Sequence, residues 1–211
     1  MFDSIIYERR RQALRKKVQS GIILILGNNE APANYPANAY KFRQDSSFLY
    51  FFGQHRDGLV GVIDCESGKE VLIGDEIDID DIVWYGSVTS VVEMAQQSGV
   101  TATAPMAKLA EIVATAKQQG RKVHFLPPYR HDTMIQLMDL TGIHPSKQKG
   151  EASLALINAV VKLRSKKSAE EIAEMERASH IGYLMHTAAM SLAKPGVTER
   201  YIGGVLDGIA A

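Results

Sequence analysis

Few side chains in this sequence have the types and spacing that could hold a metal ion. His180 and His186 are six positions apart on one predicted helix, so they point about 240° apart around its axis and cannot bind one ion together. Cys65 is the only cysteine and has no companion ligand nearby in the sequence. The acidic segment 75–81 lacks the glycine and the glutamate that an EF-hand calcium loop requires. The sequence therefore predicts no metal site in this chain.

Motifs for nucleophilic and nucleotide chemistry are missing as well. Gly86-Ser87 does not stand in the G-x-S-x-G frame that presents a nucleophilic serine on a strand-to-helix turn. Gly203, Gly204 and Gly208 match neither phosphate-loop spacing, and they fall in a predicted helix rather than after a strand. We therefore expect no catalytic residue in the chain.

Trp84, the only tryptophan, is the one residue that indicates a binding role. It follows segment 75–81, whose polar residues are typical of a surface loop, and loop aromatics tend to serve recognition. Gly86 permits a turn that presents the ring to solvent, and Tyr85 would then point the other way, toward the core. The alternative is that Trp84 fills the core. We give it about the same weight as the binding role, because most tryptophan side chains are largely buried.

The composition narrows the class of protein. Lys and Arg together number 24, as do Asp and Glu, so the formal net charge is zero and no nucleic-acid or membrane partner is indicated. The longest aliphatic run, 22–26, is far shorter than the roughly 20 residues that span a bilayer. A lone Cys65 permits no intrachain disulfide, which is typical of a reducing compartment. With no secretory signal pattern at the N-terminus, we expect a cytoplasmic protein.

The first half of the chain alternates helical and extended patterns. Apolar residues at helical spacing predict a helix over 3–19, and the short β-branched run 22–26 predicts a strand that is buried on both faces. Three further apolar runs are separated by turn residues and predict an antiparallel meander. These runs are 48–52, 59–63 and 71–73.

Helices and strands also alternate in the next part of the chain. The pattern predicts a helix over 105–120, a strand over 122–126, and a helix over 132–142 with Asp132 as its cap. We therefore interpret residues 1–150 as one α/β domain with a mixed β-sheet flanked by helices.

The polar segment 143–153, which contains Pro and Gly, predicts a domain boundary. A linker helix is expected over 151–167. Ser168 and Glu171 then form a capping-box pattern at the start of a long helix that Pro195 ends.

We interpret residues 168–211 as the truncated start of a second domain, with a last helix capped by Thr198. The long helix carries an apolar face that its missing domain would cover. We expect that face to associate with another surface or to stay exposed. It comprises Ile172, Met175, Ile181 and Met185.

One contiguous block connects these patterns to a known family. Residues 40–53, YKFRQDSSFLYFFG, resemble the F/Y-R-Q-[DN]-S-x-F-x-Y-F-x-G signature of aminopeptidase P, the Xaa-Pro aminopeptidases. Residues 83–86 are similar to the short W-x-G segment of that family. A third set resembles the L-R-x-x-K-S-x-x-E-I entry into the family's catalytic domain, which prolidases share. It comprises Leu163, Arg164, Lys167, Ser168, Glu171 and Ile172.

The resemblance implies a creatinase-type N-terminal α/β domain followed by the first helices of a pita-bread metallopeptidase domain. In that family two divalent metal ions, usually Mn²⁺, are held by two Asp, one His and two Glu, and the bridging water attacks the bond before proline. All five ligands are expected beyond residue 211. The resemblance therefore implies that this chain holds no cofactor of its own and is inactive alone.

The same resemblance implies partners. The parent enzyme would act on peptides with proline at the second position and would form a homo-oligomer. Trp84 would bind substrate, because the family's W-x-G tryptophan approaches the substrate site of a neighbouring subunit. Ala37 and Ala39 stand in a loop where some members carry an acid, so no such contact is expected from them.

Two other interpretations remain open at this point. The parent could be a prolidase, which cleaves only Xaa-Pro dipeptides, because the second set of motifs is common to both enzymes. The chain could also be a stand-alone, non-enzymatic domain for oligomerisation or binding. The gene sequence beyond residue 211 would distinguish them.

Overall fold

The computed structural model describes residues 1–77, 82–84, 86 and 88–211. It divides into two compact units, Met1–Arg164 and Ser165–Ala211, whereas the sequence predicted limits at residues 150 and 167. Among the described residues, no helix is long and apolar enough to cross a membrane.

Unit 1 is built on a mixed five-stranded sheet in the order β4-β3-β2-β1-β5. The pairs β1·β2 and β2·β3 are antiparallel, and the pairs β1·β5 and β3·β4 are parallel. The predicted α/β class with a mixed sheet is therefore confirmed. The strands are β1 (Ile22–Leu26), β2 (Val60–Asp64), β3 (Glu70–Ile73), β4 (Ala102–Ala104) and β5 (Val123–His124).

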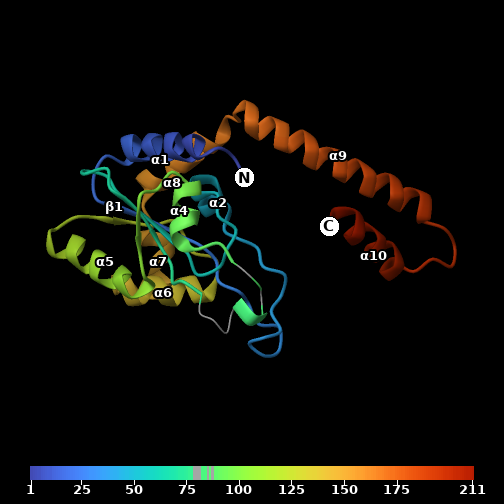
Figure 1. Cartoon of the computed structure of the whole chain (residues 1–211), viewed down its shortest axis with the longest axis horizontal. Helices are drawn as coiled ribbons and strands as arrows, with labels where there is room; N and C mark the ends of the chain where they lie inside the picture. Colours follow the sequence, from blue (N-terminus) through green and yellow to red (C-terminus); the bar gives the residue numbers. More distant parts are fainter. Residues whose placement is uncertain (78–81, 85, 87) are drawn as a thin grey trace. The chain divides into compact units, whose positions relative to one another are not determined.

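Helices cover both faces of this sheet (Figure 1). One face packs against α1 (Ser4–Val18), α2 (Ser46–Phe52), α4 (Val91–Gln97) and α8 (Leu154–Ser165). The other face packs against α5 (Leu109–Gln118), which follows the 3₁₀ turn η1 (Met106–Lys108). Helix α6 (His131–Thr141) contacts α5, and α7 (Pro145–Glu151) contacts α6.

Side-chain alternation along β1 explains why two separate cores form. Ile23 and Ile25 face one core, whereas Ile22 and Leu24 face the other, as the period of two in an extended strand requires. All four are at most 2 % exposed. The predicted strand with two buried faces is confirmed.

The predicted strand over 48–52 is wrong, because this segment is helix α2. The carboxylate of Asp45 caps the helix by accepting hydrogen bonds from the backbone N–H groups of Ser47 and Phe48, at 2.8 and 2.9 Å. Gly53 ends it in the left-handed conformation, with φ of 70°. The buried aromatic residues are Phe48, Phe51 and Phe52, at positions i, i+3 and i+4, so the run has a helical period rather than a strand period.

Other local predictions need correction too. The meander consists of β1, β2 and β3, since the 48–52 run is not a strand. Segment 143–153, predicted as a domain boundary, contains helix α7, which the sequence did not predict and whose first residue is Pro145. Asp132 lies in the first turn of α6 rather than at its cap, which is Arg130. Neither α4 nor β4 was predicted.

The helix predicted as a linker over 151–167 corresponds to α8, which belongs to unit 1. Leu156, Ala159 and Val160 are buried in the same core as α1 and α2. The hydroxyl of Tyr50 in α2 also donates to the carbonyl of Leu163, at 3.2 Å. This helix therefore completes the sheet domain.

Unit 2 contains α9 (Ala169–Leu192) and α10 (Glu199–Ala210), which contact each other. The predicted capping box of Ser168 and Glu171 at the start of α9 is confirmed, as is the cap of α10 by Thr198. No residue of either helix is buried. Of the predicted apolar face, Ile172, Met175 and Ile181 are 48 %, 53 % and 41 % exposed.

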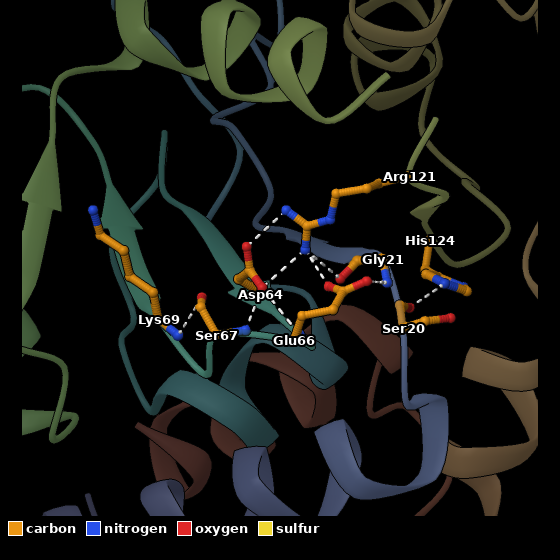
Figure 2. Close-up of polar contacts among 8 residues, drawn as sticks. All are labelled: Ser20, Gly21, Asp64, Glu66, Ser67, Lys69, Arg121 and His124. Atoms are coloured by element: carbon orange, nitrogen blue, oxygen red, sulfur yellow. Dashed lines mark hydrogen bonds and ion pairs between the residues drawn. The ribbon is translucent and has the colours of Figure 1, made fainter. Parts of the chain in front are cut away.

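Arg121 organises the end of the sheet where β1 begins (Figure 2). Its guanidinium donates to Asp64 at 2.9 Å, to Glu66, and to the carbonyl of Gly21 at 3.3 Å. Burial raises the pKa of Asp64, but hydrogen bonds from Arg121 and Ser67 outweigh it and lower the pKa to about 2. Arg121 thus joins the β2–β3 turn to the start of β1 and to β5.

His124 connects β5 to two other segments. Its Nε2 lies 2.9 Å from the carbonyl oxygen of Ser20, and its Nδ1 lies 2.6 Å from Oγ of Ser153. A carbonyl only accepts, so Nε2 carries the hydrogen and Nδ1 of the neutral ring accepts from Ser153. Burial lowers the pKa of His124, so the folded protein holds this ring neutral.

This arrangement predicts that the protein loses stability in mild acid. The unfolded chain takes up a proton on His124 near pH 6.5, whereas the folded chain does so only at lower pH. The free energy of unfolding should therefore be nearly constant between about pH 7 and pH 8 and fall below pH 6.5 by up to about 1.4 kcal/mol per pH unit. Urea melts from about pH 8 to about pH 5.5 measure it.

His124→Gln should flatten this dependence, whereas His55→Gln, at an exposed position, should keep it. An unfolding free energy that does not change over this range in the unmodified chain would contradict the assignment.

Candidate functional site

Several loops meet at the opposite end of the sheet from Arg121. Leu26 pairs with Val60, Val60 with Ile73, and Ile73 with Ala104. One end of the sheet therefore carries the ends of β1, β3 and β4 and the start of β2, with the loops attached to them. We call this region the loop end.

The side-chain amide of Gln44 joins two of these loops. Its Oε1 accepts from the backbone N–H groups of Asn28, at 2.6 Å, and Asp45, at 2.8 Å. Its Nε2 donates to the carbonyl of Arg56, at 2.6 Å. Gln44 is only 2 % exposed, so water cannot replace these partners without local opening. The loop after β1 and the loop before β2 are thus fixed to residue 44.

Gly27 is required beside this amide. A Cβ on Gly27 would lie 2.6 Å from the carbonyl oxygen of Leu59 and 3.1 Å from the amide atoms of Gln44. The first of these distances is shorter than a real Cβ contact, so only glycine lets the two loops approach so closely.

Asp45 and Tyr129 extend the network to the loop after β5. Asp45 caps α2, and its other oxygen accepts from the hydroxyl of Tyr129 at 3.1 Å. The side chain of Asn28 donates to the carbonyl of Arg43 at 2.8 Å and to Tyr129 at 3.2 Å. Burial is the main cause of a raised pKa at Tyr129, so its hydroxyl keeps its proton and remains a donor.

Two polar residues of the 40–53 block, Gln44 and Asp45, therefore hold loops and a helix cap. Three of its apolar residues, Phe48, Phe51 and Phe52, are fully buried. The block that carries the family resemblance thus builds the scaffold of the loop end.

A cleft of about 540 Å³ opens at the loop end. Two of its acids accept hydrogen bonds from backbone N–H groups. Both carboxylate oxygens of Glu76 accept from the N–H of Val91 at 3.0 Å. The carboxylate of Asp75 accepts from the N–H of Met106 at 2.8 Å. Arg56 donates to the carbonyl of Asp75. The lining residues are Glu30, Arg56, Asp57, Gly58, Asp75, Glu76, Ile77 and Val88.

Trp84 is 83 % exposed, which excludes the alternative that it fills the core of this chain. Its neighbours Ile82 and Val83 are also exposed, at 45 % and 75 %. The cleft is lined by Ile77 and Val88, on either side of Trp84 in the sequence. Tyr85 and Ser87 lie outside the described residues, so the predicted inward direction of Tyr85 is not tested.

The described residues contain no group of three or more His, Cys, Asp or Glu side chains that could hold a metal ion. Of the acidic segment 75–81, residues 78–81 lie outside the described part. Cys65 is buried, and burial, with Glu66 and Asp64, raises its pKa to about 11. Its thiol is therefore protonated near neutral pH and unsuited to nucleophilic attack.

The sequence did not predict the contacts of Gln44, Asn28, Arg56 and Tyr129 at the loop end, nor the cap formed by Asp45. Of these residues Asp45 alone had a local signal, because an Asp followed by apolar residues at helical spacing is a helix N-terminus pattern. The partners of Gln44 are backbone groups from loops that only the fold brings together.

Comparisons with known proteins agree with this scaffold. The family model described as "Aminopeptidase P, N-terminal domain" matches residues 7–124. The chain is 26 % identical over 206 residues to the Xaa-Pro aminopeptidase of Escherichia coli K12, covering 94 % of this chain and 47 % of that protein. It is 28 % identical over 113 residues to the human Xaa-Pro dipeptidase, covering 52 % of this chain and 23 % of that one.

Solved structures show the same fold. Aminopeptidase P from E. coli, in a low-pH form, superposes with a TM-score of 0.77 at 24 % identity, covering 99 % of this chain and 49 % of that one. Aminopeptidase PepP of Pseudomonas aeruginosa gives a TM-score of 0.79 at 24 % identity with the same coverage. The chain thus spans about half the length of these relatives.

The role of Gln44 predicts a large loss of stability in Gln44→Ala. The variant leaves the buried N–H of Asn28 and the carbonyl of Arg56 unpaired, and each unmatched group costs about 1–3 kcal/mol. We expect a fall of roughly 3 kcal/mol in the free energy of unfolding, measured by urea melts. Gln12→Ala, at an exposed position of α1, is the matched control and should change it by under about 0.5 kcal/mol. Equal losses in the two variants would contradict the role given to Gln44.

Proposed function

The chain belongs to the family of aminopeptidase P N-terminal domains, and on this basis we propose that it is the N-terminal part of a Xaa-Pro aminopeptidase. The observation that carries the proposal is the family match over residues 7–124. The parent would release an N-terminal residue that precedes proline. Within it, this chain would supply a folded scaffold and a substrate-side surface.

The chemistry of the proposed parent is metal-dependent hydrolysis with two divalent ions, Mn²⁺ by the family resemblance. The described residues do not fit such a centre, since none of them form a group of three or more possible ligands. We therefore derive no catalytic step in this chain. The metal ligands are proposed to lie in the half of the relatives' length that this chain does not span.

The loop end is the surface that we propose faces substrate. Trp84 is exposed, and it lies in the sequence between Ile77 and Val88, which line a cleft with four acids and one arginine. An exposed indole can stack on an apolar or proline side chain. We propose that Trp84 contacts peptide bound to a neighbouring subunit of a homo-oligomer, and that the parent is cytoplasmic.

A prolidase remains the alternative enzyme, supported by the 28 % identity to the human Xaa-Pro dipeptidase over 113 residues. The wider coverage of the chain by an aminopeptidase, 94 % against 52 %, favours the aminopeptidase. A stand-alone binding domain would need no metal and no catalytic half.

The proposal predicts that the purified chain alone hydrolyses no Xaa-Pro peptide, because the residues that the structure describes offer no ligand set for the metal ions. The assay incubates the chain with Mn²⁺ and a tripeptide that has proline at its second position, beside an Xaa-Pro dipeptide. Elemental analysis of the dialysed protein should find no stoichiometric metal. Turnover above the blank, or one tightly held ion per chain, would contradict the prediction.

A surface role for Trp84 predicts that Trp84→Ala changes the free energy of unfolding by no more than about 0.5 kcal/mol. Phe51→Ala, at a fully buried aromatic, is the matched control and should cost about 3–5 kcal/mol. Iodide should quench the fluorescence of the single tryptophan. A loss near that of Phe51→Ala, without quenching, would place Trp84 in a buried site.

A further inference from the structure

A second cavity lies on the face of the sheet that α5 covers, away from the loop end. Its volume is about 290 Å³, near the lower limit of small-molecule sites, which run from about 300 to 1,000 Å³. All of its lining residues belong to unit 1. The cavity has no part in the function proposed above.

The floor of the cavity is apolar. Ile22, Val62 and Val71 line it from the strands β1, β2 and β3, and Ile112 and Ala116 line it from α5. The three strands are paired with one another in the sheet, so their side chains lie side by side on this floor. An aliphatic group placed here would replace water next to apolar side chains, which is favourable.

Four charged side chains line the cavity, and three of them are paired. Arg121 is bonded to Asp64 and Glu66, and Glu111 is bonded to Lys108 at 2.8 Å.

The fourth charged side chain, Lys69, has no ion-pair partner for its ammonium group among the described residues. In Figure 2 dashed lines join the side chain of Arg121 to three groups. The one dashed line at Lys69 ends on its backbone N–H, not on its ammonium group. The lining charges and their direct partners balance overall, and among the described residues the exposed ammonium group of Lys69 is the one charged lining group outside an ion pair.

We propose that this cavity binds an aliphatic monocarboxylate, with the carboxylate paired to Lys69 and the aliphatic body on the floor formed by Ile22, Val62 and Val71. A single unpaired cation favours one negative group, and the small volume favours a compact body. Both a free branched-chain acid and the C-terminal residue of a peptide have this chemistry.

Isothermal titration calorimetry of the full chain tests the proposal with 4-methylpentanoate and N-acetyl-leucine. At least one of the two should bind, and 4-methylpentylamine should bind at least tenfold more weakly than that acid. Binding of N-acetyl-leucine assigns the site to peptide C-termini, whereas binding of 4-methylpentanoate alone assigns it to free acids. Either result supports the carboxylate site.

Two variants locate the binding. Lys69→Gln should weaken it about tenfold or more, whereas Lys122→Gln, the same charge change outside the lining, should leave it unchanged. Thr115→Trp places a large ring at an exposed lining position of α5 and should abolish it. A urea melt of each variant checks that it is folded.

Three results would overturn the proposal. The first is no binding of either acid at millimolar concentration. The second is binding of the amine as tight as that of the acid. The third is binding that is unaffected by both Lys69→Gln and Thr115→Trp in folded protein.

Discussion

The buried amide of Gln44 is the interaction on which the loop end depends. It has one acceptor and one donor group, and each meets a backbone partner at a normal or short hydrogen-bond distance. Buried backbone groups that lose such a partner are costly, so the loops after β1 and before β2 are held to the segment that starts α2. The acidic cleft, which Arg56, Asp57 and Gly58 help to line, therefore opens beside loops that are fixed in this way. In this chain, Gln44, Asp45 and the three buried phenylalanines of the 40–53 block therefore make structural contacts.

The sequence predicted those elements whose signals are local. The strand at 22–26, the hairpin strands β2 and β3, and the capping box at Ser168 are each specified by adjacent residues, and all are confirmed. Helix α2 was missed because five consecutive apolar residues fit the helical period and the strand period equally well. Only Asp45 before the run and Gly53 after it distinguish a helix. Strand β4 has three small or polar residues, so no apolar pattern marks it, and its place comes from pairing with β3.

The candidate site was harder to predict than the fold, for a physical reason. Exposure of Trp84 could be anticipated from a polar flank and Gly86, because both are local. The contacts of Gln44 with Asn28, and of Tyr129 with Asp45, join positions 16 and 84 residues apart. Such pairs follow from strand order, which composition and periodicity do not specify. The ion pairs among the charged residues that line the cavity beside α5 likewise follow only once the fold places β3 and α5 together.

Native-state hydrogen exchange at the amides of Asn28 and Asp45 tests the central claim most directly. Both N–H groups donate to the buried Oε1 of Gln44, although they lie in loops, where amides usually exchange fast. We expect opening free energies close to those of the β1 amides, since these groups become exposed only when the scaffold itself opens. Exchange as fast as that of an exposed loop amide, such as that of Lys41, would contradict the claim that Gln44 holds this end of the sheet.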